Sequence, residues 1–218
     1  MRFSESEVQL SRRVRMVEGQ LRGRGISDDR VLKVMGELPR QFFVSAELSG
    51  EAYDDNPLDI GQGQTISQPY IVALMSEALE LRDSDLVLEV GTGCGYQTAI
   101  LAELSKWVYS IEVRKALSDS AKVRLGELGV ENVSYHVGDG YDGWPEAIEF
   151  DKILVAAAAD EVPEGLLNQL RDGGRMVIPV GGGFDQRLLL ITKLGGKVKE
   201  HLLCCCRFVK LIHSGGAI

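Results

Sequence analysis

The sequence predicts an α/β fold in which helices cover a mostly parallel sheet. Three observations lead to this prediction. Strand-like and helix-like segments alternate regularly from residue 85 onward, as they do in proteins with a parallel sheet. A glycine-rich turn at residues 91–95 joins the first strand of this series to the first helix, as in nucleotide-binding βαβ units. The last two strand-like segments have no helix between them, which predicts an antiparallel edge.

Seven strands are expected in total. The first five are short apolar segments bounded by turn-forming residues, at 86–90, 107–112, 132–137, 150–156 and 175–180. Helices with apolar residues at helical spacing are expected between them at 96–104, 114–128 and 160–170, with an irregular segment at 141–148. The last two strands, 187–193 and 199–212, are separated only by Gly195-Gly196 and should pair with each other.

The first 80 residues predict a helical extension and a loop that precede the sheet. Helices with an apolar stripe are expected at 7–23, 28–37 and 69–81. We expect Ser27 to cap the second of these helices, and Pro39 follows its end. Residues 40–66 are polar, rich in turn formers and without core-forming periodicity, which predicts a functional loop. We expect one domain, 1–218, in which residues 81–218 form the α/β core.

The composition is that of an acidic globular protein. The 218 residues carry a formal net charge of −8, which disfavours binding to nucleic acid through a broad basic surface. No apolar run reaches membrane-spanning length, and the polar segment Met1–Glu7 has no signal-peptide core. We therefore expect a cytoplasmic monomer that binds neither nucleic acid nor a membrane.

The four cysteines predict neither a disulfide framework nor a metal site. Cys94 lies in the glycine-rich turn, and Cys204, Cys205 and Cys206 are consecutive. Consecutive residues of a strand point to alternate faces, so three of them make a poor metal cage. The sequence contains no C-x-x-C pair. We expect reduced cysteines that fill apolar space, and no bound metal.

The spacing of the glycine-rich turn argues against a dinucleotide ligand. A dinucleotide-binding turn has the pattern G-x-G-x-x-G, and counting from Gly91 its last position is occupied by Tyr96. The sequence instead has G-x-G-x-G, with Glu89 two residues before the first glycine. A tight strand-to-helix turn without any ligand is the alternative for this turn taken alone.

Residues that follow the next strands favour a ligand that contains adenosine, because ligands of such sheets bind at the carboxyl ends of the strands. Glu112 ends the second strand, and its two oxygens can accept hydrogen bonds from two ribose hydroxyls. Asp139 follows the third strand and can accept from an exocyclic amine, while Gly140 allows a base edge to approach. No Walker lysine is present to hold phosphates. S-adenosylmethionine fits this set, with its amino-acid end near the glycines.

Five segments together resemble the protein-L-isoaspartate O-methyltransferase family. They are Asp59–Met75, Leu88–Gln97, Tyr109–Glu112, Gly138–Gly140 followed by Gly143-Trp144-Pro145, and Gly173–Gly181. The resemblance extends from about residue 10 to residue 212. The element Gln64–Pro69 is specific to this family, whereas the glycine-rich turn is common to most methyltransferases of this Rossmann-like fold.

The resemblance implies a protein repair reaction. Members of the family transfer a methyl group from S-adenosylmethionine to the α-carboxylate of L-isoaspartyl residues in damaged proteins, and the ester then collapses to a succinimide. A carboxylate is already ionised at pH 7, so no strong general base is required. Ser67 corresponds to the family's active-site serine, and we expect it to orient the acceptor; a simple N-cap of the helix at Pro69 is the alternative.

The resemblance also implies contacts for the remaining site residues. The expected cofactor contacts are Gln64, Thr65, Ile66, Gly91, Thr92, Gly93, Gly95, Gln97, Glu112, Asp139 and Gly140. The expected substrate contacts are Thr65, Ser67 and Val180. Three departures from the family pattern are Cys94 in place of serine, Lys210 in place of proline, and the run Cys204–Cys206. Two alternatives to the repair reaction are methyl transfer to another carboxylate acceptor and a cofactor-binding module without transfer activity.

Overall fold

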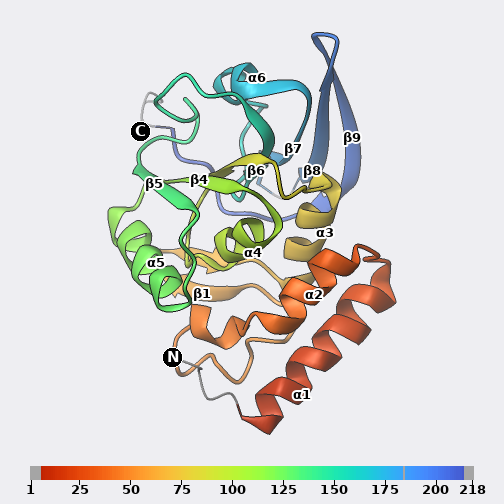
Figure 1. Ribbon diagram of the computed structural model, residues 1–218, viewed down its shortest axis with the longest axis vertical. Coiled ribbons are helices and arrows are strands. Elements are labelled where there is room, and N and C mark those ends of the chain that lie inside the picture. Colours follow the sequence, from red (N-terminus) through yellow and green to blue (C-terminus); the bar gives the residue numbers. More distant parts are fainter. Residues whose placement is uncertain (1–5, 184, 214–218) are drawn as a thin grey trace.

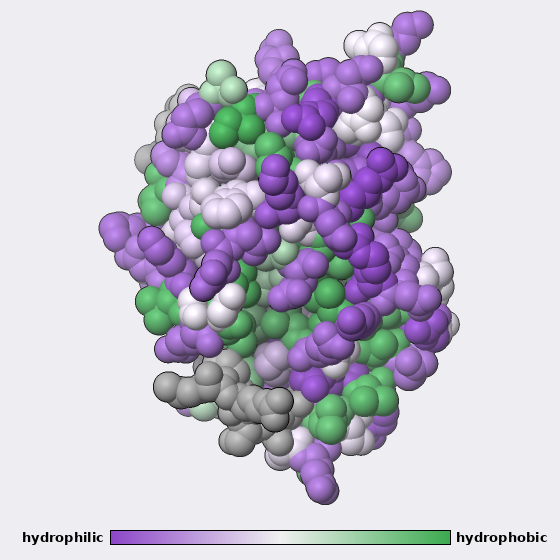
Figure 2. Space-filling model, in the orientation of Figure 1, coloured by the Kyte–Doolittle hydropathy of each residue, from purple (hydrophilic) through white to green (hydrophobic). Residues whose placement is uncertain are grey.

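The computed structural model describes residues 6–183 and 185–213, so the predicted absence of a signal-peptide core at the first five residues lies outside the described residues. A seven-stranded sheet forms the centre of the molecule, with helices packed on both of its faces (Figure 1). Hydrophilic residues dominate the face shown in Figure 2, and apolar residues occupy smaller areas between them. No helix within the described ranges combines the length and apolarity needed to cross a bilayer.

The strand order of the sheet is β5-β4-β3-β6-β7-β8-β9. The strands are β3 (Leu86–Val90), β4 (Trp107–Glu112), β5 (Val133–Val137), β6 (Phe150–Val155), β7 (Leu170–Gly182), β8 (Asp185–Leu194) and β9 (Lys197–Cys206). The first five are parallel, and β8 and β9 are antiparallel to their neighbours. The predicted seven-stranded, mostly parallel sheet with an antiparallel edge is therefore confirmed. The β8–β9 hairpin projects beyond the rest of the sheet (Figure 1).

Alternation of side chains along β3 connects the sheet to two hydrophobic cores. Val87 belongs to the core that also contains residues of the N-terminal helices, α3 (Pro69–Leu79) and α4 (Tyr96–Leu104). Leu88 and Val90 belong to the core on the opposite face, which includes Leu166 of α6 (Glu164–Gln169). A strand whose neighbouring side chains enter different cores is buried on both faces, as expected for the centre of a parallel sheet. α5 (Lys115–Glu127) packs against β4 and β5.

The N-terminal helical extension is present, with different geometry from that predicted. α1 (Glu7–Arg15) continues as a π-helical turn over residues 16–21 and a 3-10 turn over residues 22–24, and it ends at Gly25 in the left-handed conformation. The single predicted helix 7–23 is thus one helical segment of three kinds. Most of the burial falls in the π-helical turn, where Met16, Val17 and Leu21 are buried, whereas the 3-10 turn buries no residue.

The predicted cap of the second helix was wrong. α2 (Asp29–Glu37) is capped by Asp28, whose carboxylate accepts hydrogen bonds from the backbone N–H groups of Arg30 and Val31. Ser27 instead donates its backbone N–H and its hydroxyl to Glu77 of α3, at 2.6 and 3.2 Å. Asp and Ser are comparable caps by propensity, so the tertiary contact with Glu77 decides between them.

Three other boundaries differ from the prediction. β7 begins at Leu170, before Gly173-Gly174, because a register shift between Phe150 and Lys152 of β6 accommodates the two glycines within the strand. β9 ends at Cys206, and the chain then crosses the sheet as a single extended segment rather than as a strand to residue 212. The predicted loop 40–66 contains a 3-10 turn, residues 40–43, and a hairpin of β1 (Leu58–Gly61) and β2 (Gln64–Ile66).

Candidate active site

The glycine-rich turn lies at the carboxyl end of β3, where the strand order reverses and a crevice forms outside the sheet. Gly91, Gly93 and Gly95 have φ angles of 102°, 54° and 91°, a backbone region that residues with a Cβ rarely adopt. Backbone N–H groups of Gly91 and Thr92 donate to the carbonyl of Ile111 at 2.8 and 3.3 Å. The turn is therefore fixed to the end of the neighbouring strand β4.

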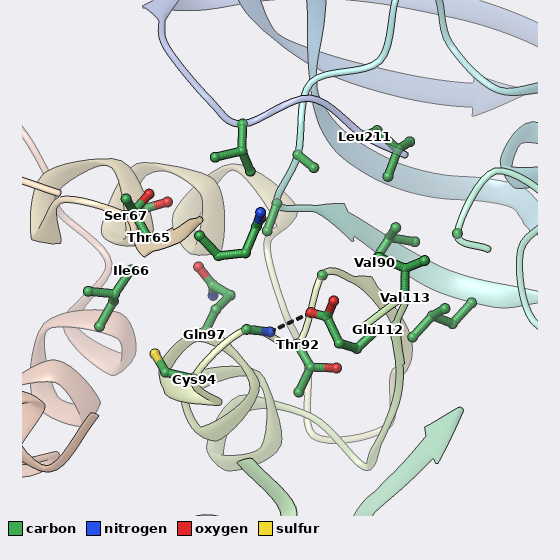
Figure 3. Close-up of a pocket in the computed structure, with 18 of the residues that line it drawn as sticks. Thr65, Ile66, Ser67, Val90, Thr92, Cys94, Gln97, Glu112, Val113 and Leu211 are labelled. Carbon is green, nitrogen blue, oxygen red and sulfur yellow. Dashed lines mark hydrogen bonds between the residues drawn. The ribbon is translucent and has the colours of Figure 1, made fainter. Parts of the chain in front are cut away.

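Glu112 at the end of β4 is held by backbone donors on both of its oxygens. Its Oε2 accepts from the N–H of Gly93 at 2.9 Å, and its Oε1 accepts from the N–H of Arg114 at 3.0 Å (Figure 3). The residue is only 7% exposed, yet it lines the cavity described below. A carboxylate has about four acceptor sites, so two more donors can bind after these two bonds are made.

A second carboxylate, Glu89, lies fully buried within β3 beneath the turn. Its Oε2 accepts hydrogen bonds from the hydroxyls of Thr98 and Ser110, each at 2.6 Å, and its Oε1 has no hydrogen-bond partner. Ser110 also bonds to the hydroxyl of Thr92 at 2.6 Å. Burial raises the pKa of Glu89 to about 8, against the opposing effect of these hydroxyls, and the nearby charge of Glu112 raises it further. Glu89 therefore holds its proton at neutral pH.

The hairpin β1–β2 lies over the turn and leads into Ser67. Its two turn residues, Gln62 and Gly63, have φ angles of 56° and 68°, the left-handed pair of a tight two-residue hairpin. A Cβ built on Gly93 would lie 3.4 Å from Cδ1 of Ile60, so the hairpin approaches the glycine turn closely. Ser67 follows the hairpin, and Gln68 is the N-cap residue of α3 without a capping side-chain bond. The alternative of Ser67 as a simple N-cap is therefore not the arrangement seen.

Between the hairpin and the sheet lies a cavity with about 870 Å³ of empty space, including its open mouth. Ser67 and Thr65 lie at one end of it, and Glu112 and Val113 lie at the other (Figure 3). A smaller cavity, with about 370 Å³ of empty space, is lined by Thr65, Ser67 and residues 207–209 among others. Thr65 and Ser67 thus border both cavities.

The segment after β9 closes the remaining side of the large cavity. Residues 209–212 line it. The N–H of Ala158 donates to the carbonyl of Val209, and the N–H of Leu211 donates to the carbonyl of Ala158, each at 2.8 Å. Lys210, which replaces the expected proline, forms an ion pair with Asp160 at 3.1 Å. Lys210 also forms an isolated parallel bridge with Ala158, so this departure from the family pattern lies beside the end of β6.

The end of β5 carries Asp139 and Gly140, which the sequence predicts to contact the base of a ligand. Gly138 and Gly140 line the large cavity, and a Cβ on Gly140 would overlap Cγ1 of Val90. Asp139 itself accepts from the N–H of Tyr141 at 2.9 Å, and its other oxygen bonds to Nδ1 of His213 at 2.9 Å. The carboxylate of Asp139 therefore already contacts a ring nitrogen in this structure.

Comparison with known proteins agrees with this geometry. The family model for protein-L-isoaspartate(D-aspartate) O-methyltransferase matches residues 12–215. The chain is 54% identical over 203 residues to the protein-L-isoaspartate O-methyltransferase of Petrotoga mobilis, covering 92% of this chain and 95% of that protein. The chain belongs to the protein-L-isoaspartate(D-aspartate) O-methyltransferase family.

Further relatives of this methyltransferase family extend the match to solved structures. The enzyme of Methylorubrum extorquens is 56% identical over 183 residues, which cover 84% of this chain and 80% of that one. A protein-L-isoaspartate O-methyltransferase from Plasmodium falciparum, solved in complex with S-adenosyl-L-homocysteine, superposes with a TM-score of 0.80 at 28% identity, covering 94% and 98% of the two chains. A second structure of that name gives a TM-score of 0.82 at 32% identity, covering 94% of this chain and 66% of that one.

Most of the methyltransferase site residues predicted from the sequence meet at the large cavity. Its lining includes the predicted residues Gln64, Thr65, Ile66, Ser67, Gly91, Thr92, Gly93, Gln97, Glu112 and Gly140. Three predicted residues lie outside that lining. Gly95 faces α5, where a Cβ would lie 3.1 Å from Leu125 Cδ1. Asp139 is directed to His213. Val180 is buried at the end of β7 beside Ala159 and borders neither cavity.

The methyltransferase cavity also contains residues that the sequence reasoning missed. They are mostly apolar side chains from strand ends, from helices α3 and α4 and from the hairpin, together with the segment after β9: Ile60, Val72, Met75, Val90, Tyr96, Ile111, Val113, Gly138, Val209, Lys210, Leu211 and Ile212. Cys94 of the predicted turn also lines the cavity, as do Ala156 and Ala157, whose small side chains at the end of a strand predict room for a ligand. Apolar residues at strand ends look like core residues in a sequence. Only their position next to the predicted contacts could have suggested them. Within the described ranges no group of three or more potential metal ligands occurs.

Proposed function

We propose that this chain transfers a methyl group from S-adenosylmethionine to the α-carboxylate of L-isoaspartyl residues in damaged proteins. The observation that carries the proposal is the position of Thr65 and Ser67, which border both the large cavity and the smaller one. A donor in the large cavity and an acceptor in the smaller one would meet at these two residues. Such a meeting point is what a direct transfer between two bound molecules requires.

The large cavity fits the methyl donor. Glu112 lines it with acceptor capacity left for two ribose hydroxyls, and the glycine turn leaves the backbone of Gly91 and Gly93 open to a ligand. Gln97 is fixed in the lining by its bond to the hydroxyl of Ser76 at 2.9 Å. When bound, S-adenosylmethionine supplies an electrophilic methyl group on a positively charged sulfur.

The chain then has to hold the acceptor in line and keep water out. An isoaspartyl carboxylate is ionised at neutral pH, so no residue of the chain needs to remove a proton from it. We assign Ser67 the role of an orienting donor to this carboxylate, and Thr65 the role of a contact beside it. The hairpin β1–β2 carries Thr65 and leads into Ser67. A bound acceptor that displaces water from this place would strengthen the attraction between an anion and a cation.

Burial also keeps the turn free of competing charge. It raises the pKa of the Cys94 thiol, so the residue that replaces serine in this turn remains neutral beside the donor site. The product ester, as in the family, collapses without the enzyme to a succinimide whose hydrolysis returns part of the material as normal aspartyl.

We further propose that the chain works as a cytoplasmic monomer without a nucleic-acid partner, and that residues 1–80 and 81–218 act as one domain. Four free cysteines suit a reducing compartment, and a net charge of −8 disfavours nucleic acid. The N-terminal helices share a hydrophobic core with the sheet. Light scattering on the eluting protein checks the oligomeric state, and a dimer mass would contradict the proposal.

A pair of peptides tests the proposed reaction. The two peptides have one sequence and differ only in an L-isoaspartyl or an L-aspartyl linkage. Methyl transfer to the first and not to the second supports repair. Transfer to both, or only to unrelated small carboxylic acids, would favour a different carboxylate acceptor. Binding of S-adenosylhomocysteine without any transfer would favour a binding module.

A further inference from the structure

Arg40 is a fully buried cation directly behind the acceptor loop. It lies in the 3-10 turn of residues 40–43 and has no exposed surface. Its Nε donates to the carbonyl of Ala52 at 2.7 Å, and its Nη2 donates to the carbonyl of Ser67 at 2.8 Å. Its guanidinium carbon lies 4.8 Å from the ring centre of Tyr96. One side chain therefore joins the acceptor loop to the first residue of α4.

Arg40 carries its charge without a directly paired carboxylate among the described residues. In the parts of the chain that the structure describes, no carboxylate forms an ion pair with it, and its Nη1 has no hydrogen-bond partner. Burial lowers the pKa of Arg40, with Tyr96 as the largest opposing influence, yet arginine remains protonated in proteins. Asp55 favours the charged form of Arg40 without forming an ion pair with it. A buried charge that lacks a direct ion pair costs folding free energy, so its presence here calls for a functional explanation.

The site next to Arg40 is the one that has to receive an anion. The guanidinium donates to the carbonyl of Ser67, a residue that borders both cavities, while Arg40 itself lines neither of them. A positive charge at that place attracts a carboxylate more strongly than a neutral group of the same shape, and the low polarity of the interior strengthens this preference. The hydrogen bond to the Ser67 carbonyl also fixes the peptide that carries the Ser67 side chain.

We propose that Arg40 is a positioning residue that selects an anionic acceptor: it holds Ser67 in place and gives the acceptor site a positive potential. The inference rests on the proposed function, since it assumes that the acceptor is a carboxylate. Arg40 does not touch the reacting atoms. It acts through the backbone of Ser67 and through its positive charge.

The test compares two variants of Arg40. Arg40→Lys keeps the charge, and Arg40→Gln removes the charge but keeps a hydrogen-bond donor. For each protein, the affinity for an isoaspartyl peptide is compared with that for the same peptide carrying an α-amide in place of the acceptor carboxylate, with S-adenosylhomocysteine bound. A loss of structure would weaken the binding of both peptides to the same extent. A loss of the positive potential at the acceptor site would weaken only the binding of the peptide that carries the carboxylate.

We expect Arg40→Gln to reduce the preference for the carboxylate peptide by about tenfold, and Arg40→Lys to keep it within about twofold of the wild-type value. Lys152→Gln is the matched control, because Lys152 is a buried cation paired with Asp85 at 3.9 Å, outside both cavities. It should lower stability and leave the preference unchanged.

Two results would overturn the inference. One is a wild-type preference in Arg40→Gln, and the other is an equal loss in Arg40→Lys and Arg40→Gln. Failure of the proposed function is recognised separately, because the wild-type chain would then not methylate the isoaspartyl peptide at all. If neither Arg40 variant folds, the same peptide comparison on wild-type protein at rising salt decides: a preference that is insensitive to salt agrees with a buried charge, and a preference that disappears contradicts it.

Discussion

The carboxylate of Glu112 accepts a hydrogen bond from the backbone N–H of Gly93 at 2.9 Å (Figure 3). The bond joins the end of β4 to the glycine turn after β3, and a second bond from the N–H of Arg114 fixes the other oxygen. The carboxylate is therefore oriented before any ligand arrives. Its remaining acceptor sites are directed by the fold rather than by the ligand.

Replacing Glu112 with glutamine should weaken cofactor binding. The variant keeps the size of the side chain, but its NH₂ group must face one of two backbone donors and has no lone pair for a ribose hydroxyl. We expect the affinity for S-adenosylhomocysteine, measured by calorimetry, to fall by about 10- to 100-fold. Wild-type affinity would refute the ribose assignment.

Replacing Ser67 with alanine should affect transfer far more than donor binding. Ser67 borders both cavities, but Glu112 lies at the other end of the large one (Figure 3). We expect turnover on an isoaspartyl peptide to fall by about 10²-fold or more, while the affinity for S-adenosylhomocysteine changes by less than about threefold. Ser67→Thr keeps a hydroxyl and serves as the control. Unchanged turnover in Ser67→Ala would remove its assigned role.

Asp139 tests the position of the adenine. Its carboxylate lies at the end of β5 next to the cavity-lining Gly138 and Gly140, and its Oδ2 contacts His213. If Asp139 accepts from the exocyclic amine of adenine, Asp139→Ala should lower the affinity for S-adenosylhomocysteine by about tenfold. The analogue with inosine in place of adenosine lacks that amine and binds more weakly, and the substitution should hardly change its affinity. An equal loss for both ligands in a calorimetric titration would contradict the assignment.

Glu89 predicts a pH dependence of stability. Its pKa is about 8 in the folded protein but about 4.3 in an unfolded chain, so the folded state binds the extra proton between these values. Its contribution to stability is therefore full below about pH 4 and is lost as the pH rises through 8. Glu89→Gln should gain on the wild type by roughly 1.4 kcal/mol per pH unit between pH 5 and 8.

Urea unfolding at a series of pH values measures this difference. A difference in unfolding free energy that stays constant from pH 5 to pH 9 would show that Glu89 is ionised in the folded protein. The hydroxyls of Thr98 and Ser110, which oppose the effect of burial, would then have the larger influence on its carboxyl group.

The strands and the glycine turn were predictable from the sequence because their signals are local. Apolar segments that alternate along the chain, and glycines in a tight turn, depend on the local backbone conformation. Strands such as β3 and β4 therefore begin and end within one residue of the prediction. The hairpin over residues 58–66 was missed because its strands are three or four residues long and carry polar side chains. Its pairing depends on the sheet and turn beneath it.

Side-chain partners distant in sequence were the least predictable part. The cap of α2 depends on Glu77, which lies about 50 residues after Ser27. The segment after β9 borders the cavity because its backbone bonds to Ala158. Arginine side chains are mostly exposed in proteins, and only the structure shows that the guanidinium of Arg40 is buried against the carbonyl of Ser67.

Methyl transfer from labelled S-adenosylmethionine to matched isoaspartyl and aspartyl peptides tests the central claim most directly. The account predicts base-labile label on the isoaspartyl peptide, because methyl esters hydrolyse in base, and about as much label on the aspartyl peptide as in a reaction without enzyme. Equal labelling of both peptides, or no labelling of either by protein that binds S-adenosylhomocysteine, would contradict it.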